Sequence, residues 1–521
     1  MKTSLYLIVA LLIAGACEDN LLETVPTDRV SKSIFWETEK DAIYAANAVY
    51  RFLDGFMVKY DGLTDILHAN VQFSAEASME RGDFNSLFPM VQNEWANHYE
   101  GIRAANNFLE NVDKVQTNKA DLIPILKAEV KVIRAYLYMK LVMLYGDVPL
   151  VTRTIHEISQ AQRVTRTPAS DIWDFINVEL EQSASILPWK QSEKGRITKG
   201  AARALQARTF LYQGNFVEAA AKASEVMSSG LYELYPKYEE LFDYAAENSS
   251  EVILDKQFVK DDYSNSAFNL GPYSHKNSGS QYVPTKKLVD AYLMKNGKSI
   301  TDPSSGFDPD NPYENRDPRL KYSVFVKGAR LYNGEIYDPT PGSGTRDEIG
   351  GTYLATSLGY NIRKYVNQED FADPTNSSIN VILIRYAEVL LTYAEAKIEL
   401  NETDQSVYDA INAIRGRSDV NLPPVDAGKT QSELRDIVRH ERMVELAFEG
   451  HRLFDLRRWK LAETVIPGFV EGMTYKNPDG SYTTVRIDGF LKVFDPGKHY
   501  LWPIPKKEID LNVNLTQNPG W

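Results

Sequence analysis

Hydrophobic residues recur at helical spacing near both ends of the chain. Residues 201–226 carry two apolar stripes separated by Gly214 and Asn215, and residues 387–414 carry two more, separated at Asn401. Positions three and four apart share one face of a helix, so each stripe predicts a helix with a buried side. Small alanines let facing helices approach closely. We therefore predict two helical hairpins that resemble the tetratricopeptide unit of about 34 residues.

Further segments show the same period. They cover residues 95–112, 127–145, 170–187 and 430–448. Thr430 and Glu433 form a capping box at the start of the last one. The sequence NPDG at Asn477–Gly480 predicts a hairpin turn. Helical repeats therefore occupy both ends of the chain, but they do not form one tandem array.

The middle of the chain, residues 251–382, breaks this pattern. Gly, Pro, Asn, Asp and Tyr dominate there, and only short runs such as 322–326 favour strands. Long loops on a rigid helical scaffold usually carry binding groups. We predict a mainly α-helical fold with a tetratricopeptide-like scaffold and a loop-rich, irregular middle region. We expect one domain over residues 17–521, divided into 17–250, the middle region and 383–521.

The first 16 residues have the pattern of a signal peptide. A positive charge at Lys2 precedes an apolar run over residues 5–16, which is shorter than the roughly 20 residues that span a bilayer. Small residues then precede Cys17, the only cysteine, as in a bacterial lipobox. We expect cleavage before Cys17 and acylation of its thiol, which anchors the protein in a membrane. The acids at 18–19 resemble the signal that sends lipoproteins of Bacteroidetes to the outer face of the outer membrane.

Composition narrows the range of ligands. The net charge is −13 and the pI is about 5.2, which disfavours binding to a nucleic-acid backbone. With Cys17 acylated, no thiol is left for a disulfide or a thiolate metal site. Aromatic residues make up 11% of the chain and 30 of them are Tyr. Their flat apolar faces suit a sugar-binding surface, but a large core uses them too.

Motifs for catalysis and for cofactors are missing. The sequence lacks the HExxH, GxSxG and Walker A patterns. His68 and His98 are better explained as satisfied polar residues than as ligands. The oxygen-rich segment DPDNPYEN, which begins at Asp308, has groups that suit a structural Ca²⁺, although a solvated loop is the simpler explanation. We expect no enzyme activity, no cofactor and no catalytic metal.

Several blocks spread over nearly the whole chain resemble the SusD/RagB family of surface glycan-binding lipoproteins. The blocks are WANHYEGIRAAN at 95–106, YGDVPL at 145–150, GRITKGAARALQAR at 195–208, NRDPRL at 315–320, HERMVELAFEGHRLFDLRRW at 440–459, Pro503–Pro505 and Gln517–Gly520. Any one block is a weak match, but their order behind a lipobox is very specific. The resemblance implies architectural roles for the motif residues. We therefore expect Arg452, Asp455 and Arg457 to form internal ion pairs and helix caps.

The same resemblance implies a function and a partner. Such a protein captures an oligo- or polysaccharide at the cell surface and delivers it to a TonB-dependent outer-membrane barrel of the SusC type, which it covers as a lid. Ligands of the family lie across loops on one side of the helical scaffold. No covalent chemistry is expected, and the barrel carries out the transport.

Residues that bind a sugar should offer aromatic faces and planar donors and acceptors on exposed loops. The candidates before the helix at 95–112 are Arg81, Asp83, Phe84, Asn85 and Phe88, although Phe84 and Phe88 fit equally well as plugs in the core. The candidates in the next loop, which we expect to be exposed, are Tyr263, Tyr273, His275 and Tyr282. The candidates in the Gly-rich stretch are Tyr332, Tyr337, Tyr353 and Tyr360.

Two other functions stay open at this point. Some relatives of the RagB type resemble peptide-uptake proteins, and a groove lined with Asp and Glu would favour cationic peptides. Aromatic platforms would favour glycans instead. A surface glycosidase would need two carboxyl groups about 5–9.5 Å apart in a cleft. Carboxylates are abundant, with 71 Asp and Glu in the chain, so counting them does not exclude such a pair.

Overall fold

A computed structural model describes residues 35–71, 74–276 and 278–521. The predicted signal peptide, the predicted lipidation site at Cys17 and the acidic pair behind it lie outside these residues. Within the described part of the chain, no helix combines the length and apolar composition that crossing a bilayer requires.

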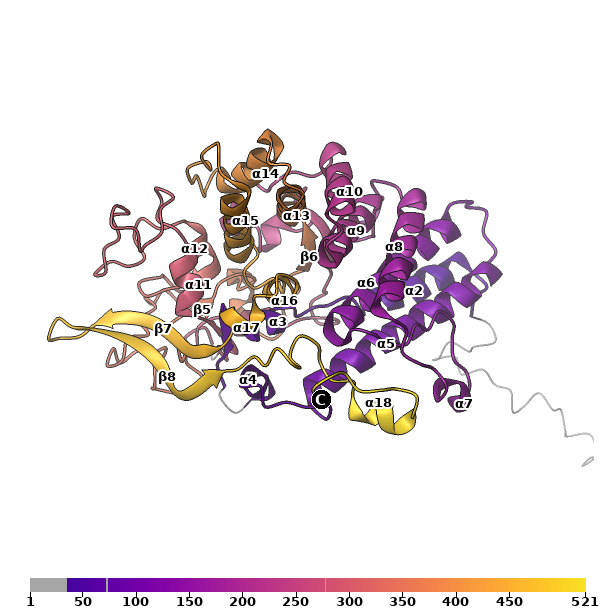
Figure 1. Ribbon diagram of the computed structural model, residues 1–521, viewed down its shortest axis with the longest axis horizontal. Helices are drawn as coiled ribbons and strands as arrows, with labels where there is room; N and C mark the ends of the chain where they lie inside the picture. The colour runs from indigo at the N-terminus through magenta and orange to yellow at the C-terminus, as the bar shows by residue number, and fades with distance from the viewer. Residues whose placement is uncertain (1–34, 72–73, 277) are drawn as a thin grey trace, which may run out of the picture.

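The long helices form one row (Figure 1). Its first members are α2 (Glu39–Tyr50), α5 (Pro89–Asn111), α6 (Leu122–Tyr145), α8 (Ala169–Ile186), α9 (Lys199–Gln213) and α10 (Phe216–Ser228). The row continues with α13 (Tyr386–Glu399), α14 (Gln405–Arg415) and α15 (Gln431–Glu445). Each helix from α2 to α13 packs against the next, and both α14 and α15 pack against α13. The predicted mainly helical fold is confirmed. The two groups predicted as separate meet in space, because α10 packs against α13.

Local sequence signals explain where several helices begin and end. Gly214 ends α9 in the left-handed region with a φ of 74°, and the Asn215 side chain caps α10 by accepting a hydrogen bond from the Glu218 amide. The predicted capping box is present, because Thr430 and Glu433 each accept a hydrogen bond from the other's backbone amide. Helix α6 is buried on nearly all sides, since α2, α5 and α8 surround it.

The middle region has little regular structure but a core of its own. Its short antiparallel pairs are β1 (Leu67–Ala69) with β3 (Tyr282–Pro284), β2 (Val252–Lys256) with β6 (Val381–Arg385), and β4 (Val324–Phe325) with β5 (Asn361–Ile362). The strand predicted at 322–326 is only partly right, because helix α12 (Arg319–Ser323) covers its start. Buried aromatic side chains hold these loops together. They include Phe268, Tyr292, Phe325, Tyr337 and Tyr360.

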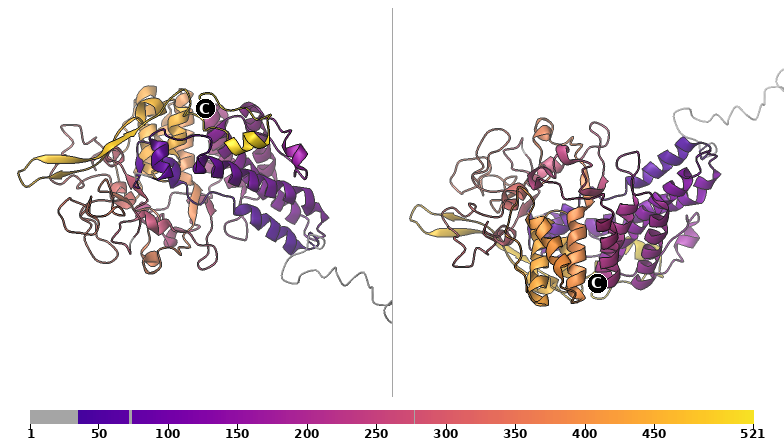
Figure 2. Two further views of the ribbon diagram at one scale, coloured as in Figure 1. Left: turned by 90° about the horizontal axis from the view of Figure 1, so that it is seen from below. Right: turned by 90° about the horizontal axis from the view of Figure 1, so that it is seen from above.

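The remaining elements are short or stand apart from the row. They are α3 (Val58–Gly62), α4 (Ala75–Glu80), α7 (Ile158–Ala161), α11 (Lys286–Ala291), α16 (Arg452–Arg458), α17 (Ala462–Val465) and α18 (Lys506–Leu511). Strands β7 (Gly468–Lys476) and β8 (Tyr482–Lys492) form a hairpin that projects from the body (Figures 1 and 2). Its tip holds the predicted turn, where the Gly480 amide donates to the Asn477 carbonyl over 2.9 Å.

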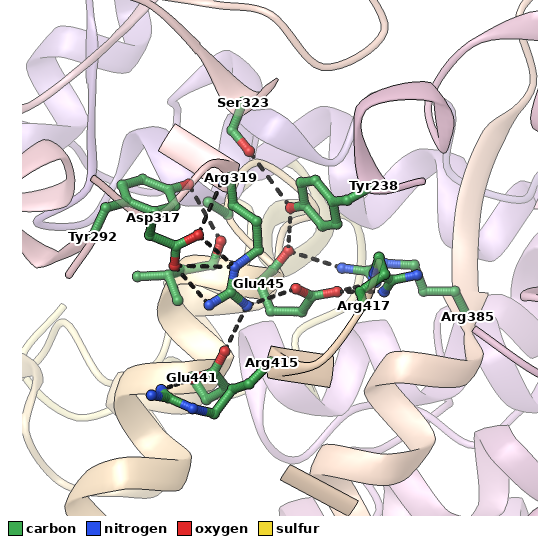
Figure 3. A network of polar contacts seen from close by, with 12 residues as sticks. Tyr238, Tyr292, Asp317, Arg319, Ser323, Arg385, Arg415, Arg417, Glu441 and Glu445 are labelled. Carbon is green, nitrogen blue, oxygen red and sulfur yellow. Dashed lines mark hydrogen bonds and ion pairs between the residues drawn. The ribbon is translucent and has the colours of Figure 1, made fainter. Parts of the chain in front are cut away.

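A buried network of charges joins the middle region to the C-terminal helices (Figure 3). Glu445 on α15 accepts hydrogen bonds from Arg319 at 2.9 Å, from Arg385 at 2.7 Å and from Arg417 at 3.1 Å. Burial disfavours the charge on Glu445, but these three arginines outweigh it and lower the pKa of the carboxyl well below its usual range. The carboxylate therefore stays ionised and has a structural role.

The residues expected to form ion pairs divide into two groups. Arg452 pairs with Asp65 at 2.9 Å and Asp455 pairs with Arg442 at 2.9 Å, which confirms both predictions. The ion-pair prediction is wrong for Arg457, which pairs with no carboxylate in the described chain, whereas its hydrogen bond to Met143 in the last turn of α6 agrees with the predicted helix cap. Its guanidinium instead donates to the carbonyl oxygens of nearby backbone, because α16 places it against loop residues and the end of α6.

Candidate ligand-binding groove

Three adjoining hollows form an open groove between the N-terminal helices and strand β2. The first, of about 610 Å³, shares Arg51, Leu53, Lys256 and Tyr263 with the second, of about 460 Å³. The third, of about 270 Å³, shares residues 193–196 with the first. Three connected hollows of these volumes leave room for an extended ligand.

A pair of stacked rings stands where the first two hollows meet. The rings of Phe258 and Tyr263 are nearly parallel, with centroids 5.4 Å apart and an angle of 11° between the planes. A tight turn places them, because Val259 and Tyr263 exchange two backbone hydrogen bonds of 2.9 Å. The Tyr263 residue is 42% exposed, so part of its side chain can meet a ligand. Stacked rings offer a flat apolar surface with a polar edge.

The cation next to these rings is held in place by backbone. The Lys256 ammonium lies 5.6 Å from the Phe258 ring centroid and 5.5 Å from that of Tyr263. It also donates to the carbonyl oxygens of Arg51, at 2.9 Å, and Leu53, at 2.6 Å. These bonds tie strand β2 to the end of α2 and fix the aromatic pair relative to the groove wall.

Polar side chains complete the lining. Asn47, Asn97 and Gln257 are exposed planar amides that can both donate and accept hydrogen bonds. Lysines and arginines are nearly as numerous as Asp and Glu in the first two hollows. The groove therefore has no strong excess of either charge. Such a surface suits a neutral, hydroxyl-rich ligand better than a cationic one.

A cluster of acids and one histidine lies at the floor of the second hollow. One oxygen each of Asp54 and Glu94 and one nitrogen of His98 lie within 4.8 Å of one another, and the described residues contain no other group with this spacing. Lysines already neutralise both acids, because Lys140 contacts Asp54 at 3.1 Å and Lys59 contacts Glu94. A metal ion would have to displace these ammonium groups.

The same cluster is unsuited to acid catalysis. Burial disfavours the charge on Asp54, but Lys140 outweighs it and holds the pKa of Asp54 below its usual value. Burial likewise opposes the charge on Glu94, and Lys59 lowers the pKa of that carboxyl. Both carboxyls are therefore ionised at neutral pH, whereas a glycosidase needs one of its two carboxyls protonated.

The loop candidates before α5 do not reach this groove. Phe84 is 9% exposed and stacks on His499, with centroids 5.2 Å apart, and Phe88 packs against the main core. Both rings therefore pack into the hydrophobic core and are not placed to bind a ligand. The Arg81 guanidinium lies 5.2 Å from the ring centroid of Phe490. The remaining two candidates, which are exposed, are Asp83 and Asn85.

The predicted exposure of the middle-region candidates is wrong for several side chains. The buried ones are His275, Tyr282, Tyr337 and Tyr360. The His275 ring stacks on Tyr332, with centroids 4.8 Å apart, and burial lowers the pKa of His275 to about 4. Loops that fold back on each other bury these rings without any helical stripe in the sequence. Tyr353 is 77% exposed and Tyr273 is half-buried.

Tyr263 is the one predicted ligand residue that lines the groove. Sequence reasoning missed Asn47, Arg51, Phe258 and Trp189, because polar positions on a helix and single aromatics in loops carry no distinctive pattern. The oxygen-rich loop that begins at Asp308 contacts strands β7 and β8. Its Asp310 carboxylate accepts hydrogen bonds from Lys476, at 2.7 Å, and from a tyrosine hydroxyl of β8.

Comparisons with known proteins agree with this fold. A family model described as "SusD family" matches residues 250–521, more than half of the chain, and one described as "Starch-binding associating with outer membrane" matches residues 63–211. A SusD-like protein of Formosa agariphila is 27% identical, with full coverage of both chains.

Solved structures give the same result. A SusD-like carbohydrate-binding protein from Bacteroides fragilis is 28% identical, with a TM-score of 0.84 over 92% of this chain and 100% of that one. Another SusD-like protein from the same species is 26% identical, with a TM-score of 0.82 over 96% of this chain and 100% of that one. The chain belongs to the SusD family.

Proposed function

We propose that this protein binds an oligo- or polysaccharide in the groove and releases it chemically unchanged. The exposed stack of Tyr263 on Phe258 is the observation that carries the proposal. A sugar ring presents an apolar C–H face to such a surface, while its hydroxyls meet the amides and charged groups around it. The description of a similar Bacteroides fragilis protein as carbohydrate-binding supports this ligand class.

The groove favours a glycan over a cationic peptide, the alternative raised by the RagB type. A site for cationic peptides would carry an excess of carboxylates, but acids and bases nearly balance here. The lysine-paired acids at the floor do not supply the protonated carboxyl that a surface glycosidase needs. We expect binding to need neither a cofactor nor a metal.

We infer the cellular setting from the leader and from family membership. Acylation at Cys17 would hold the protein at the outer face of the outer membrane, and the family description names an association with that membrane. A TonB-dependent barrel of the SusC type would receive the captured glycan, with this protein as its lid. Removing the groove's aromatic pair should then reduce uptake as well as binding.

The experiment uses a soluble chain that begins after Cys17, tested against plant and host polysaccharides and short peptides. We expect binding to at least one glycan, with no new reducing ends after long incubation. Tyr263→Ala should weaken that binding about ten-fold, because it removes a stacking face. Tyr482→Ala is the matched control, since Tyr482 is 43% exposed and lies on the distant β8.

Each alternative outcome has a distinct meaning. Binding of peptides alone would replace the proposal with peptide uptake. If glycan binding is retained in Tyr263→Ala but lost in Tyr353→Ala, the binding site lies at the exposed loop that carries Tyr353 and not in the groove. Release of shorter sugars from a polysaccharide would contradict the proposal that the protein leaves its ligand chemically unchanged.

A further inference from the structure

A second cavity, of about 630 Å³, shares no lining residue with the groove. It lies between the end of α6, the start of α8, helix α16 and the C-terminal segment. Its aromatic and cationic lining residues include Trp173, Tyr212, Phe454, Arg166, Arg457 and Lys460. Its size is within the usual range for small-molecule sites.

Arg457 is a buried cation in the wall of this cavity, and it lacks a counter-charge. The residue is 8% exposed, and it donates to the carbonyl oxygens of His499, at 2.9 Å, and Met143, at 3.4 Å. Its Nε has no hydrogen-bond partner, and no carboxylate of the described chain pairs with it. Burial of this unpaired charge lowers the pKa of Arg457 to about 9. A buried cation of this kind normally has an anionic partner.

Two more cations line the cavity without an ion pair in the described residues. The Arg166 guanidinium donates to the carbonyl oxygens of Asp147, at 2.8 Å, and Thr516, at 3.0 Å. The Lys460 ammonium lies 4.1 Å from the ring centroid of Tyr500. Asp147 is the one carboxylate among the lining residues, and it accepts a hydrogen bond from the amide at the start of α8.

The cavity thus concentrates positive charge in a chain whose net charge is −13. The neighbouring Arg458 shows the contrast, because Glu395 and Asp455 neutralise it at 2.6 Å and 2.8 Å. Arg458 also lines the cavity, so the missing counter-charge distinguishes Arg457 from its neighbour on the same helix. Aromatic walls next to fixed guanidinium groups match a ligand that has both a ring and an anionic group.

We propose that this cavity binds an acidic sugar of the hexuronate class, with its carboxylate on Arg457 and its ring against the aromatic wall. A carboxylate fits the planar fork of a guanidinium group. Arg166 and Lys460, which also line the cavity, add attraction for the anion. The choice of a sugar acid rests on the carbohydrate binding proposed for the groove. The anion site rests on the cavity alone.

The test is calorimetric titration of the soluble chain with sodium glucuronate, using neutral glucuronamide as the matched ligand. We expect glucuronate to bind and glucuronamide to bind about ten-fold more weakly. Arg457→Met should abolish the preference for the acid. Lys460→Met changes an exposed side chain, so we expect this variant to fold like the wild type. It should weaken glucuronate binding a few-fold. Tyr263→Ala, in the groove, should leave glucuronate binding unchanged.

Several results would overturn this site. Equal affinity for the acid and the amide, or full glucuronate binding in both the Arg457→Met and Lys460→Met variants, would remove the proposed anchor. Binding of inorganic phosphate in place of glucuronate would make it a phosphate site. Loss of glucuronate binding in Tyr263→Ala would put the acidic sugar in the groove. Neutral glycans that still bind the groove would show that the proposed function stands without this second site.

Discussion

Arg208 on α9 and Glu388 on α13 form a buried two-point ion pair across the junction of the helical row. The guanidinium Nε lies 2.6 Å from one carboxylate oxygen, and Nη2 lies 2.5 Å from the other. The same Nη2 donates to the carbonyl oxygen of Leu383 over 2.6 Å. The pair therefore ties the N-terminal helices both to α13 and to the strand that precedes it.

Glu388→Ala should lower the free energy of unfolding by about 3–5 kcal/mol, because it leaves the Arg208 charge buried and unpaired. Chemical denaturation measures the change. The double variant Arg208→Met/Glu388→Leu should lose less than the single one, since it removes both charges. Glu240→Ala, in the exposed pair with Lys237, is the control and should have far less effect. A single variant as stable as wild type would contradict a role for this pair.

Trp189→Ala should weaken the binding of long oligosaccharides more than that of short ones. Trp189 lines the third hollow, where the Lys199 ammonium lies 5.3 Å from its ring centroid, while Tyr263 lines the first two. A short ligand seated on Tyr263 would not reach Trp189, so its affinity should stay the same. Titration with a series of chain lengths measures this. An equal loss at every length would mean that the hollows are not successive subsites.

Acid should destabilise the fold through Glu449. Burial opposes the charge of this residue, but Arg385 at 2.7 Å and Lys364 at 2.9 Å outweigh it and lower the pKa of Glu449 to about 2. The unfolded chain titrates near the ordinary value of 4.5. The stabilisation is therefore complete above pH 4.5 and is lost as the pH falls toward 2, by roughly 3 kcal/mol.

The variant Glu449→Gln isolates this contribution. It should be less stable than wild type at pH 7, because Arg385 and Lys364 lose a counter-charge, and its stability should fall less steeply between pH 5 and pH 2. Denaturant titrations over this range give both slopes. Parallel slopes for the two proteins would mean that another carboxyl controls acid unfolding.

Gly101→Ala should destabilise the contact between α5 and α6. An added Cβ would lie 2.6 Å from a methyl group of Leu137 and 2.9 Å from the Cβ of Phe52. Overpacking of this kind costs about 1–3 kcal/mol, more than the helix propensity that alanine gains. Arg103→Ala, on the exposed side of the same helix, is the control and should change stability by less than about 0.5 kcal/mol. Stability equal to wild type would show that the helices can separate.

Much of the fold could be predicted from sequence because its signals are local. The stripes at 201–226 and 387–414 became α9–α10 and α13–α14, and the capping box at Thr430 opens α15. Each of these features depends on residues three or four positions apart, so the chain specifies them without distant contacts. Family membership was likewise readable, because the motif blocks are continuous in sequence.

The candidate site was harder to predict from the sequence, because it is formed by segments that lie far apart in the chain. Tyr263 was singled out, but its groove is assembled from the end of α2, the loop at 193–196 and strand β2. His275 and Tyr282 come from the same kind of sequence as Tyr263, yet they are buried. No feature of the neighbouring sequence distinguishes an aromatic side chain in a loop that is exposed to water from one that another loop covers.

The sequence by itself therefore determined the helices, their caps and the family, since short-range periodicity and hydrogen bonding encode them. Only the tertiary structure decided which charges find partners. Arg452 meets Asp65 from far along the chain, whereas Arg457, on the same helix, meets only backbone carbonyls. Whether a buried charge is paired depends on which distant side chain the packing brings within hydrogen-bond distance, and that choice is made by the fold as a whole.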